Sequence, residues 1–132
     1  MSDLTGSRHV ARERALQLFY EAHIKERPVD EIVAALATAP ADYTVLLLRS
    51  AEAHEPRALA LIDEHAHDWS VDRLALIDRL VMTLALGELL LDEPPPVAVV
   101  LDEAVGLAKE YSTDASGSFV NGVLSACVAH LH

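Results

Sequence analysis

Aromatic residues are scarce in this chain, and a strand pattern is missing. Only 5% of the 132 residues are Phe, Trp or Tyr, although 52% are hydrophobic. Strands draw on aromatic and β-branched side chains, whereas Ala and Leu favour helices. No segment shows the alternation of apolar and polar residues that is typical of a half-buried strand. We therefore expect an all-α fold whose core is built mainly from Ala, Leu and Val.

The chain also lacks a long uninterrupted hydrophobic run and a second cysteine. Its N-terminus has no apolar core like that of a signal peptide, and Asp78, Arg79 and Glu88 interrupt the most apolar stretch, residues 74–91. The single cysteine, Cys127, has no partner in the chain for a disulfide. These absences disfavour export and membrane spanning, and they predict a cytoplasmic protein with a reduced, buried thiol.

Positive charge is in short supply and is unevenly distributed. The formal net charge is −11, from ten Lys and Arg against 21 Asp and Glu. Residues 1–27 contain five of the Lys and Arg against four acidic residues, a net charge of +1, which leaves −12 for the other 105 residues. The first segment is therefore the expected site for an anionic partner.

Periodic apolar residues, capping residues and prolines predict about seven helices in one domain, residues 1–132. We place N-caps at Ser7, Asp30 and Ser70, and a break near Glu55 because Pro56 is poorly tolerated inside a helix. The expected helices cover about residues 7–25, 30–40, 42–54, 57–66, 70–91, 97–111 and 118–128.

The helix expected over residues 70–91 is apolar on almost every side, so we expect it to be the central, most buried one. A triple proline, residues 94–96, follows it as a stiff connector. The two helices beyond the prolines cannot bury their apolar faces alone and must pack against the central helix. We expect two small packed helical bundles, an N-terminal one of about residues 7–67 and a C-terminal one of about residues 70–131.

Residues suited to catalysis or metal binding lack a supporting context. On a helix, His65 and His67 would point about 200° apart, at roughly 100° per residue, which disfavours a metal site shared by the two. A solvated helix end explains these residues and the nearby Asp63 as well as a metal site would. Ser116 and Ser118 lie in a Gly-containing loop, where a serine ordinarily caps a helix. No Gly-rich phosphate loop is present. We expect a protein that binds other macromolecules, with no enzymatic activity, metal or cofactor.

Cations and aromatic residues occur together on the first expected helix. Arg8 and Arg12 are one turn apart and should project together, with His9 beside them and Phe19 and Tyr20 on later turns. Such a set suits single-stranded nucleic acid, through phosphate pairing and base stacking. A solvated face of an amphipathic helix is the alternative interpretation.

Several motifs follow one another in order from Arg8 to about Val128. They are RERALQLFY (12–20), Trp69, Asp78-Arg79, Glu88-Leu89, VAVVLDEAV (97–105), Ala108-Lys109 and SGSFVNGVL (116–124). Together they resemble the family of the transcription antitermination factor NusB, over nearly the whole chain. The segments 97–105 and 116–124 carry the resemblance most strongly.

The resemblance implies an all-helical fold of two small bundles and two macromolecular partners. One is NusE, which is also a small-subunit ribosomal protein, and the other is boxA RNA, which the two proteins bind jointly. In that family the complex helps RNA polymerase read through terminators, chiefly in ribosomal RNA operons. A homodimer is also possible.

The resemblance further implies roles for seven residues of this chain. Those expected at the RNA are Arg8, His9, Arg12, Gln17 and Phe119. Those expected at the partner protein are Tyr20 and Asp78. Asn121 and Gly122 can instead be structural, because Asn can bond to the backbone of the preceding loop and Gly lets helices approach closely.

This sequence departs from the family pattern at three positions. Val10 and Thr83 stand where Arg is frequent, and Ala115 stands where an acidic residue is frequent. Each lost cation removes one phosphate contact, so we expect weak RNA binding by the isolated protein. Two alternatives to an RNA-binding adaptor stay open: a protein-interaction module with little or no RNA binding, and an accessory domain to an RNA methyltransferase.

Overall fold

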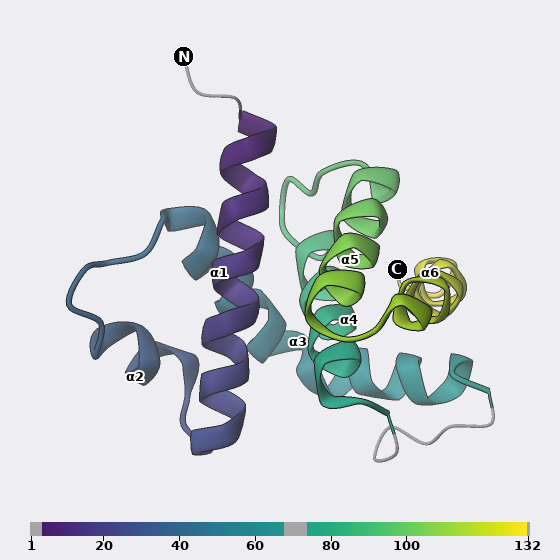
Figure 1. Ribbon diagram of the computed structural model, residues 1–132, viewed down its shortest axis with the longest axis horizontal. Coiled ribbons are helices and arrows are strands. Elements are labelled where there is room, and N and C mark those ends of the chain that lie inside the picture. Colours follow the sequence, from purple (N-terminus) through teal and green to yellow (C-terminus); the bar gives the residue numbers. More distant parts are fainter. Residues whose placement is uncertain (1–3, 68–73, 132) are drawn as a thin grey trace.

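The computed structural model describes residues 4–67 and 74–131, and these fold into an assembly of helices (Figure 1). Six helices lie in the described part of the chain: α1 (Leu4–Lys25), α2 (Val29–Ala34), α3 (Asp42–His65), α4 (Leu76–Leu89), α5 (Val97–Tyr111) and α6 (Asp114–Val128). The expected all-α fold is confirmed. None of the helices in the described residues is long and apolar enough to cross a membrane.

Helix α4 is the centre of the molecule, as its sequence predicts. Every residue from Leu80 to Leu89 is buried, and α4 contacts α1, α3, α5 and α6. Its closest neighbour is α3, since a Cβ atom built on Gly87 would lie 2.9 Å from the Cα atom of Ala51. The hydroxyl of Ser50 also donates a hydrogen bond of 2.6 Å to the carbonyl of Gly87. Glycine is therefore required here for the backbones to approach so closely.

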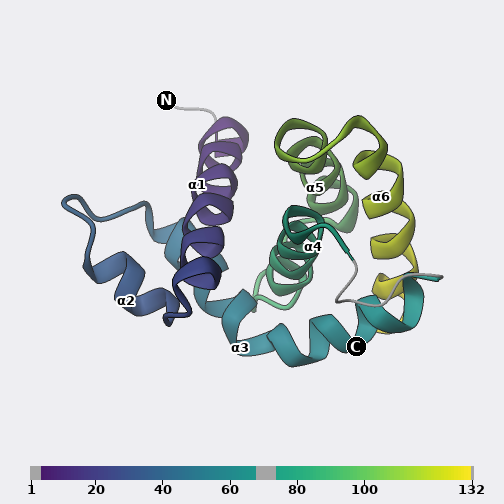
Figure 2. The same ribbon diagram turned by 60° about the horizontal axis from the view of Figure 1, so that its bottom comes forward.

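The predicted break near Glu55 is wrong, because α3 continues through Pro56 as one helix of 24 residues. A proline inside a helix removes one backbone hydrogen bond and bends the axis, and Figure 2 shows α3 changing direction part-way along its length. The segment after the bend buries Ala58, Leu61 and Ile62 in the common core. This burial offsets the lost bond, so the two expected helices are one bent helix.

Other helix ends differ from the sequence prediction by a few residues. Pro28 occupies the N-cap of α2, so Asp30 lies in the first turn and does not cap the helix. At α6 the cap is Thr113, whose side chain accepts a hydrogen bond from the backbone N–H of Ser116. The predicted cap at Ser70 lies outside the described residues.

A single hydrophobic core extends through all six helices. Figures 1 and 2 show α1 and α2 on one side, α4, α5 and α6 on the other, and α3 running beneath both groups. Contacts of α3 with α1, α2, α4 and α6 make it the element that both groups share. The division into bundles of about residues 7–67 and 70–131 stays a prediction, and its boundary lies outside the described residues.

Candidate nucleic-acid interface

The three cations predicted at the start of α1 have very different environments. The guanidinium of Arg8 is exposed and lies over the ring of Tyr43, with 4.6 Å between its carbon and the ring centroid. The side chain of His9 is 44% exposed. Arg12, one turn after Arg8, is only 5% exposed. The sequence prediction that Arg8 and Arg12 project together at the surface is therefore corrected, because α4 and α5 cover Arg12.

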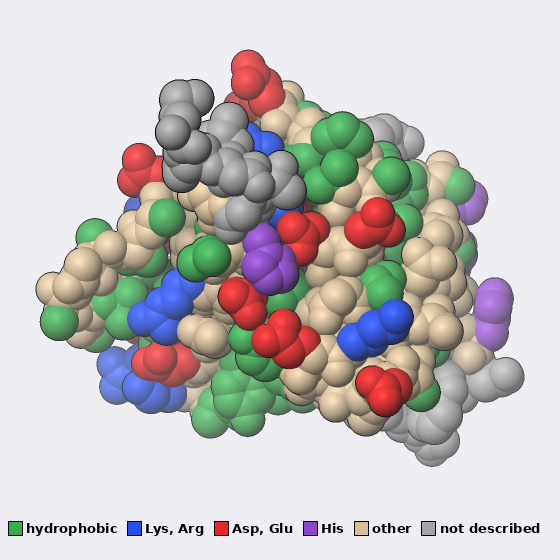
Figure 3. Space-filling model, turned by 45° about the horizontal axis from the view of Figure 1, so that its top comes forward, with side chains coloured by type: hydrophobic (Ala, Val, Ile, Leu, Met, Phe, Trp, Pro, Cys, Tyr) green, Lys and Arg blue, Asp and Glu red, His purple; other side chains and the backbone are tan. Residues whose placement is uncertain are grey.

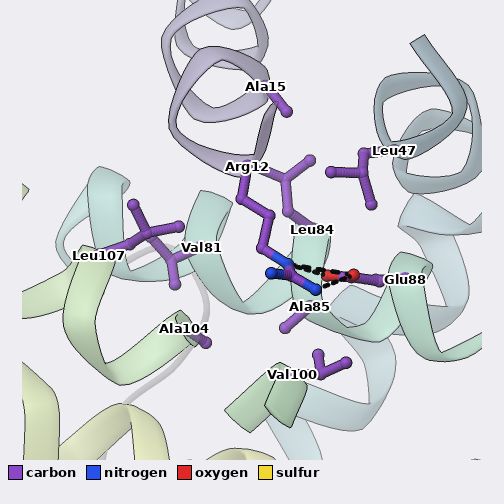
Figure 4. Close-up of a pocket in the computed structure, with 10 residues that line it drawn as sticks. All are labelled: Arg12, Ala15, Leu47, Val81, Leu84, Ala85, Glu88, Val100, Ala104 and Leu107. Atoms are coloured by element: carbon purple, nitrogen blue, oxygen red, sulfur yellow. Dashed lines mark hydrogen bonds and ion pairs between the residues drawn. The ribbon is translucent and has the colours of Figure 1, made fainter. Parts of the chain in front are cut away.

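The buried guanidinium of Arg12 is paired with two carboxylates from other helices. Figure 4 shows one of these pairs, that of Arg12 with Glu88. Its Nη2 donates to Oε2 of Glu88 at 2.7 Å, and its Nε lies 2.9 Å from Oε1 of the same residue. Its Nη1 donates to Oε1 of Glu103 at 3.1 Å. Burial alone would lower the pKa of Arg12, but the hydrogen bond to Glu88 and the attraction of both carboxylates raise it. The charge of Arg12 is therefore fixed and compensated inside the molecule.

Tyr43 completes this network from α3. Its hydroxyl donates a hydrogen bond of 2.5 Å to Oε2 of Glu88. Burial of the phenol, followed by the hydrogen bond to Glu88 and the repulsion by that carboxylate, raises the pKa of Tyr43 to about 12. The network of Arg12, Tyr43, Glu88 and Glu103 thus ties α1, α3, α4 and α5 together. We call it the interior ion-pair network.

His9 lies between carboxylates of two helices. Its Nδ1 is 2.8 Å from Oε2 of Glu103 on α5, and its Nε2 is 4.0 Å from Oε1 of Glu13 on α1. The hydrogen bond to Glu103 raises the pKa of His9, burial opposes the rise, and the attraction of Glu103, Glu13 and Glu110 adds to it. Figure 3 shows a face on which acidic side chains gather and Lys and Arg side chains are scattered. The cations of α1 therefore do not form a broad basic patch on this face.

The remaining residues expected at the RNA lie on different helices. Gln17 is exposed on α1 and accepts a hydrogen bond of 3.2 Å from Nη1 of Arg14. Phe119 is half-buried on α6 and lines a pocket between α4 and α6. Close to Gln17, the hydroxyl of Tyr111 on α5 donates a hydrogen bond of 2.9 Å to Oε2 of Glu13 on α1. The five predicted RNA residues thus include two exposed side chains, Arg8 and Gln17, two of intermediate exposure, and the buried Arg12.

The pocket beside Phe119 has a volume of about 450 Å³ and contains a predicted partner residue, Asp78. Asp78 is only 7% exposed, and its Oδ2 accepts a hydrogen bond of 3.0 Å from the hydroxyl of Ser116. Its Oδ1 is buried and has no hydrogen-bond partner in the described structure. An unsatisfied buried acceptor costs about 1–3 kcal/mol. The other residues lining the pocket are Leu74, Ala75, Thr113 and Ala115.

Tyr20, the second predicted partner residue, is 41% exposed on α1. Ile24 lies one turn later on the same helix and is 57% exposed. Two large apolar side chains at this spacing form an exposed strip on α1. Such a strip suits contact with a protein partner better than contact with phosphates.

Comparison with known proteins places these features in a family, because the NusB family model matches residues 9–129. This chain belongs to the NusB family. The transcription antitermination protein NusB of Thermobifida fusca is 39% identical over 124 residues, covering 91% of this chain and 87% of that protein. The NusB of Beutenbergia cavernae is 39% identical over 133 residues, covering 90% and 87% of the two chains.

Solved NusB structures have the same fold. NusB of T. maritima superposes with a TM-score of 0.80 at 27% identity, covering 92% of this chain and 90% of that one. A NusB solved together with NusE and double-stranded RNA has a TM-score of 0.78 at 28% identity, covering 93% of this chain and 96% of that one.

The sequence alone did not reveal the acidic partners of α1. Glu88 was noted as an interruption of an apolar stretch and as part of a family motif, Glu103 only as part of a family motif, and Tyr43 was not singled out. One signal was available: Glu88 lies in a helix that is otherwise apolar on nearly every side, and a buried carboxylate needs a paired cation or donors. The sequence could not identify that cation, because Arg12 is 76 residues away.

Proposed function

We propose that this chain is a transcription antitermination factor that binds boxA RNA jointly with NusE and promotes read-through by RNA polymerase, chiefly in ribosomal RNA operons. The observation that carries this proposal is the likeness to a NusB solved with NusE and double-stranded RNA, at 28% identity over 93% of this chain. The function is that of a non-enzymatic adaptor.

In this proposal the start of α1 contacts RNA, and the side chains that reach phosphates are Arg8 and His9. Arg8 supports this role best, since it is exposed and its guanidinium lies over the ring of Tyr43. Arg12 contributes from inside, where its pairing with Glu88 and Glu103 holds α1 against α4 and α5. Gln17 and Phe119 extend the RNA contact onto α1 and α6. A single phosphate pair positions RNA without reading its sequence.

NusE binds, in the same proposal, at Tyr20 and at the pocket of Asp78. The unpaired, buried Oδ1 of Asp78 supports this assignment because a donor from a partner that enters the pocket, such as a Lys, Arg or amide N–H, would satisfy it. Apolar residues around it, Leu74 and Ala75 among them, would bury the body of that side chain. NusE then supplies most of the positive surface for the RNA.

A ternary binding assay tests this function. The protein is mixed with NusE and a boxA RNA oligonucleotide at low salt, where electrostatic attraction is strongest. We expect a complex of all three, and Arg8→Ala should weaken RNA binding while leaving helicity and NusE binding intact. Arg27→Ala is the matched control, since Arg27 is an exposed arginine just beyond the other end of α1. Absence of a ternary complex at low salt would contradict the proposal.

A second function, a protein-interaction module with little RNA binding, is favoured by the neutralised cations. Arg12 and His9 both pair with carboxylates, and the net charge of the chain is −11. This function predicts association with NusE, or self-association seen by light scattering, whether or not RNA is present. The same assay separates the two functions, because only the adaptor gains affinity for NusE when RNA is added.

A further inference from the structure

The carboxylate of Glu103 joins the interior ion-pair network to the surface of α1. Its Oε1 accepts from Nη1 of Arg12 at 3.1 Å, and its Oε2 lies 2.8 Å from Nδ1 of His9. Each oxygen thus serves one of the two α1 residues. Since Arg12 is held in turn by Glu88, the position of Glu103 is fixed from the interior. The ring of His9 is therefore held in a defined orientation by a rigid acceptor.

Both ring nitrogens of His9 face carboxylates. Nδ1 bonds to Glu103, Nε2 is 4.0 Å from Glu13, and Glu110 on α5 also attracts the ring. A neutral imidazole has one N–H, whereas the imidazolium can donate from both nitrogens. The environment thus favours the charged form, and the pKa of His9 is raised, with the hydrogen bond to Glu103 as the largest cause.

The protonation of His9 decides the charge balance where α1 would meet RNA. Arg8, His9 and Arg12 lie close to four carboxylates, those of Glu13, Glu88, Glu103 and Glu110. With His9 protonated, the set has a net charge of −1. With His9 neutral, its net charge is −2, so protonation of His9 removes one unit of repulsion from a phosphate.

We propose that Glu103 is a positioning residue that holds His9 as a cation for contact with an RNA phosphate, so that RNA affinity falls as the pH rises. This inference rests on the proposed function. At a pH below the midpoint of its titration, His9 is an imidazolium and supplies one phosphate contact. At a pH above the midpoint, the neutral ring supplies none. For single-stranded RNA the salt slope of log affinity should therefore be steeper at low pH by about 0.7. An arginine in the same position would give no such pH dependence.

The first test uses the free protein and follows the His9 ring by NMR across its titration. Glu103→Gln keeps the shape of the side chain and removes the charge, so the midpoint of His9 should move to lower pH than in the unchanged protein. Asp102→Asn is the matched control, because it removes the same charge from the exposed neighbouring residue on α5. Circular dichroism establishes that both variants are folded. An equal midpoint in the two variants overturns the proposal.

The second test measures affinity for boxA RNA in the presence of NusE between about pH 6 and pH 8.5, at several salt concentrations. Affinity and salt slope should fall with rising pH in the unchanged protein, stay low and flat in His9→Gln, and stay high and flat in His9→Arg. Glu103→Gln should shift the fall to lower pH. A complex whose affinity is the same at every pH overturns the proposal while leaving the adaptor function standing. If no complex forms at any pH, although Glu103→Gln does shift the midpoint of His9, the proposed adaptor function is overturned. The RNA contact of His9 is then overturned with it.

Discussion

Two acidic residues of α4 are both almost fully buried, yet their hydrogen bonding differs. Glu88, near the end of the helix, is bonded by Arg12 and Tyr43. Asp78, in the first turn, is bonded by Ser116 through Oδ2, while its buried Oδ1, beside a pocket, has no hydrogen-bond partner in the described structure. A buried acid with complete bonding serves the fold, and one with an unpaired acceptor beside a pocket is suited to a ligand or partner. Burial alone therefore does not distinguish structural from functional acids in this protein.

The largest expected effect comes from removing the fully bonded acid. Glu88→Ala leaves the buried guanidinium of Arg12 with Glu103 alone, and breaking a buried ion pair costs about 3–5 kcal/mol. Urea denaturation should show that loss in the free energy of unfolding. Glu93→Ala, in the exposed connector, is the control and should change it by less than about 0.5 kcal/mol. A loss below about 1 kcal/mol for Glu88→Ala would show that Glu103 suffices for Arg12.

A smaller effect is expected from the phenol that bonds to Glu88. Tyr43→Phe removes one hydrogen bond to a charged group, which should lower the free energy of unfolding by about 1.5–3 kcal/mol at neutral pH. The advantage of Tyr43 over Phe should be constant below about pH 10, the value for an unfolded tyrosine. It should then decline as the pH rises towards about 12, the raised pKa of Tyr43. This follows because the unfolded chain releases the phenolic proton first.

Denaturation of the unchanged protein and Tyr43→Phe at several pH values between about 8 and 11 measures that difference. Tyrosinate absorbance reports the ionisation of the phenols in the folded protein. A difference that stays constant up to pH 11 would contradict the strong hydrogen bond between Tyr43 and Glu88.

The smallest change in stability is expected at the half-bonded acid. Asp78→Ala removes the bond to Ser116 but also an unsatisfied acceptor, so the free energy of unfolding should change by less than about 1 kcal/mol. Affinity for NusE should instead fall about tenfold, the equivalent of one charge-assisted hydrogen bond of roughly 1.4 kcal/mol.

Calorimetric titration with NusE measures the affinity, and Asp92→Ala, an exposed acid beyond the end of α4, is the control. If Asp78→Ala unfolds readily and the affinity of its folded fraction for NusE is unchanged, the contrast between the two acids disappears.

Much of the fold was predictable because helical periodicity is a local property of the chain. The apolar face over 97–111 predicted α5 with its observed ends, and the all-round apolar character of 74–91 predicted a central α4. The break at Pro56 was mispredicted because local propensity weighs one lost hydrogen bond, whereas the burial of Leu61 and Ile62 that sustains α3 depends on other helices.

The candidate site, like the fold, was predictable from the sequence only in its local features. The sequence alone determined that Arg8, His9 and Arg12 lie within one turn and a half of the same helix, and that the first segment is the least acidic part of the chain. Only the tertiary structure decided which of these cations meets solvent. Arg12 is buried and His9 is held by Glu103 because α4 and α5 pack on α1 through residues 76 to 94 positions away. Periodicity reports which side of a helix a residue occupies, but the partner that covers that side is set by packing over the whole chain.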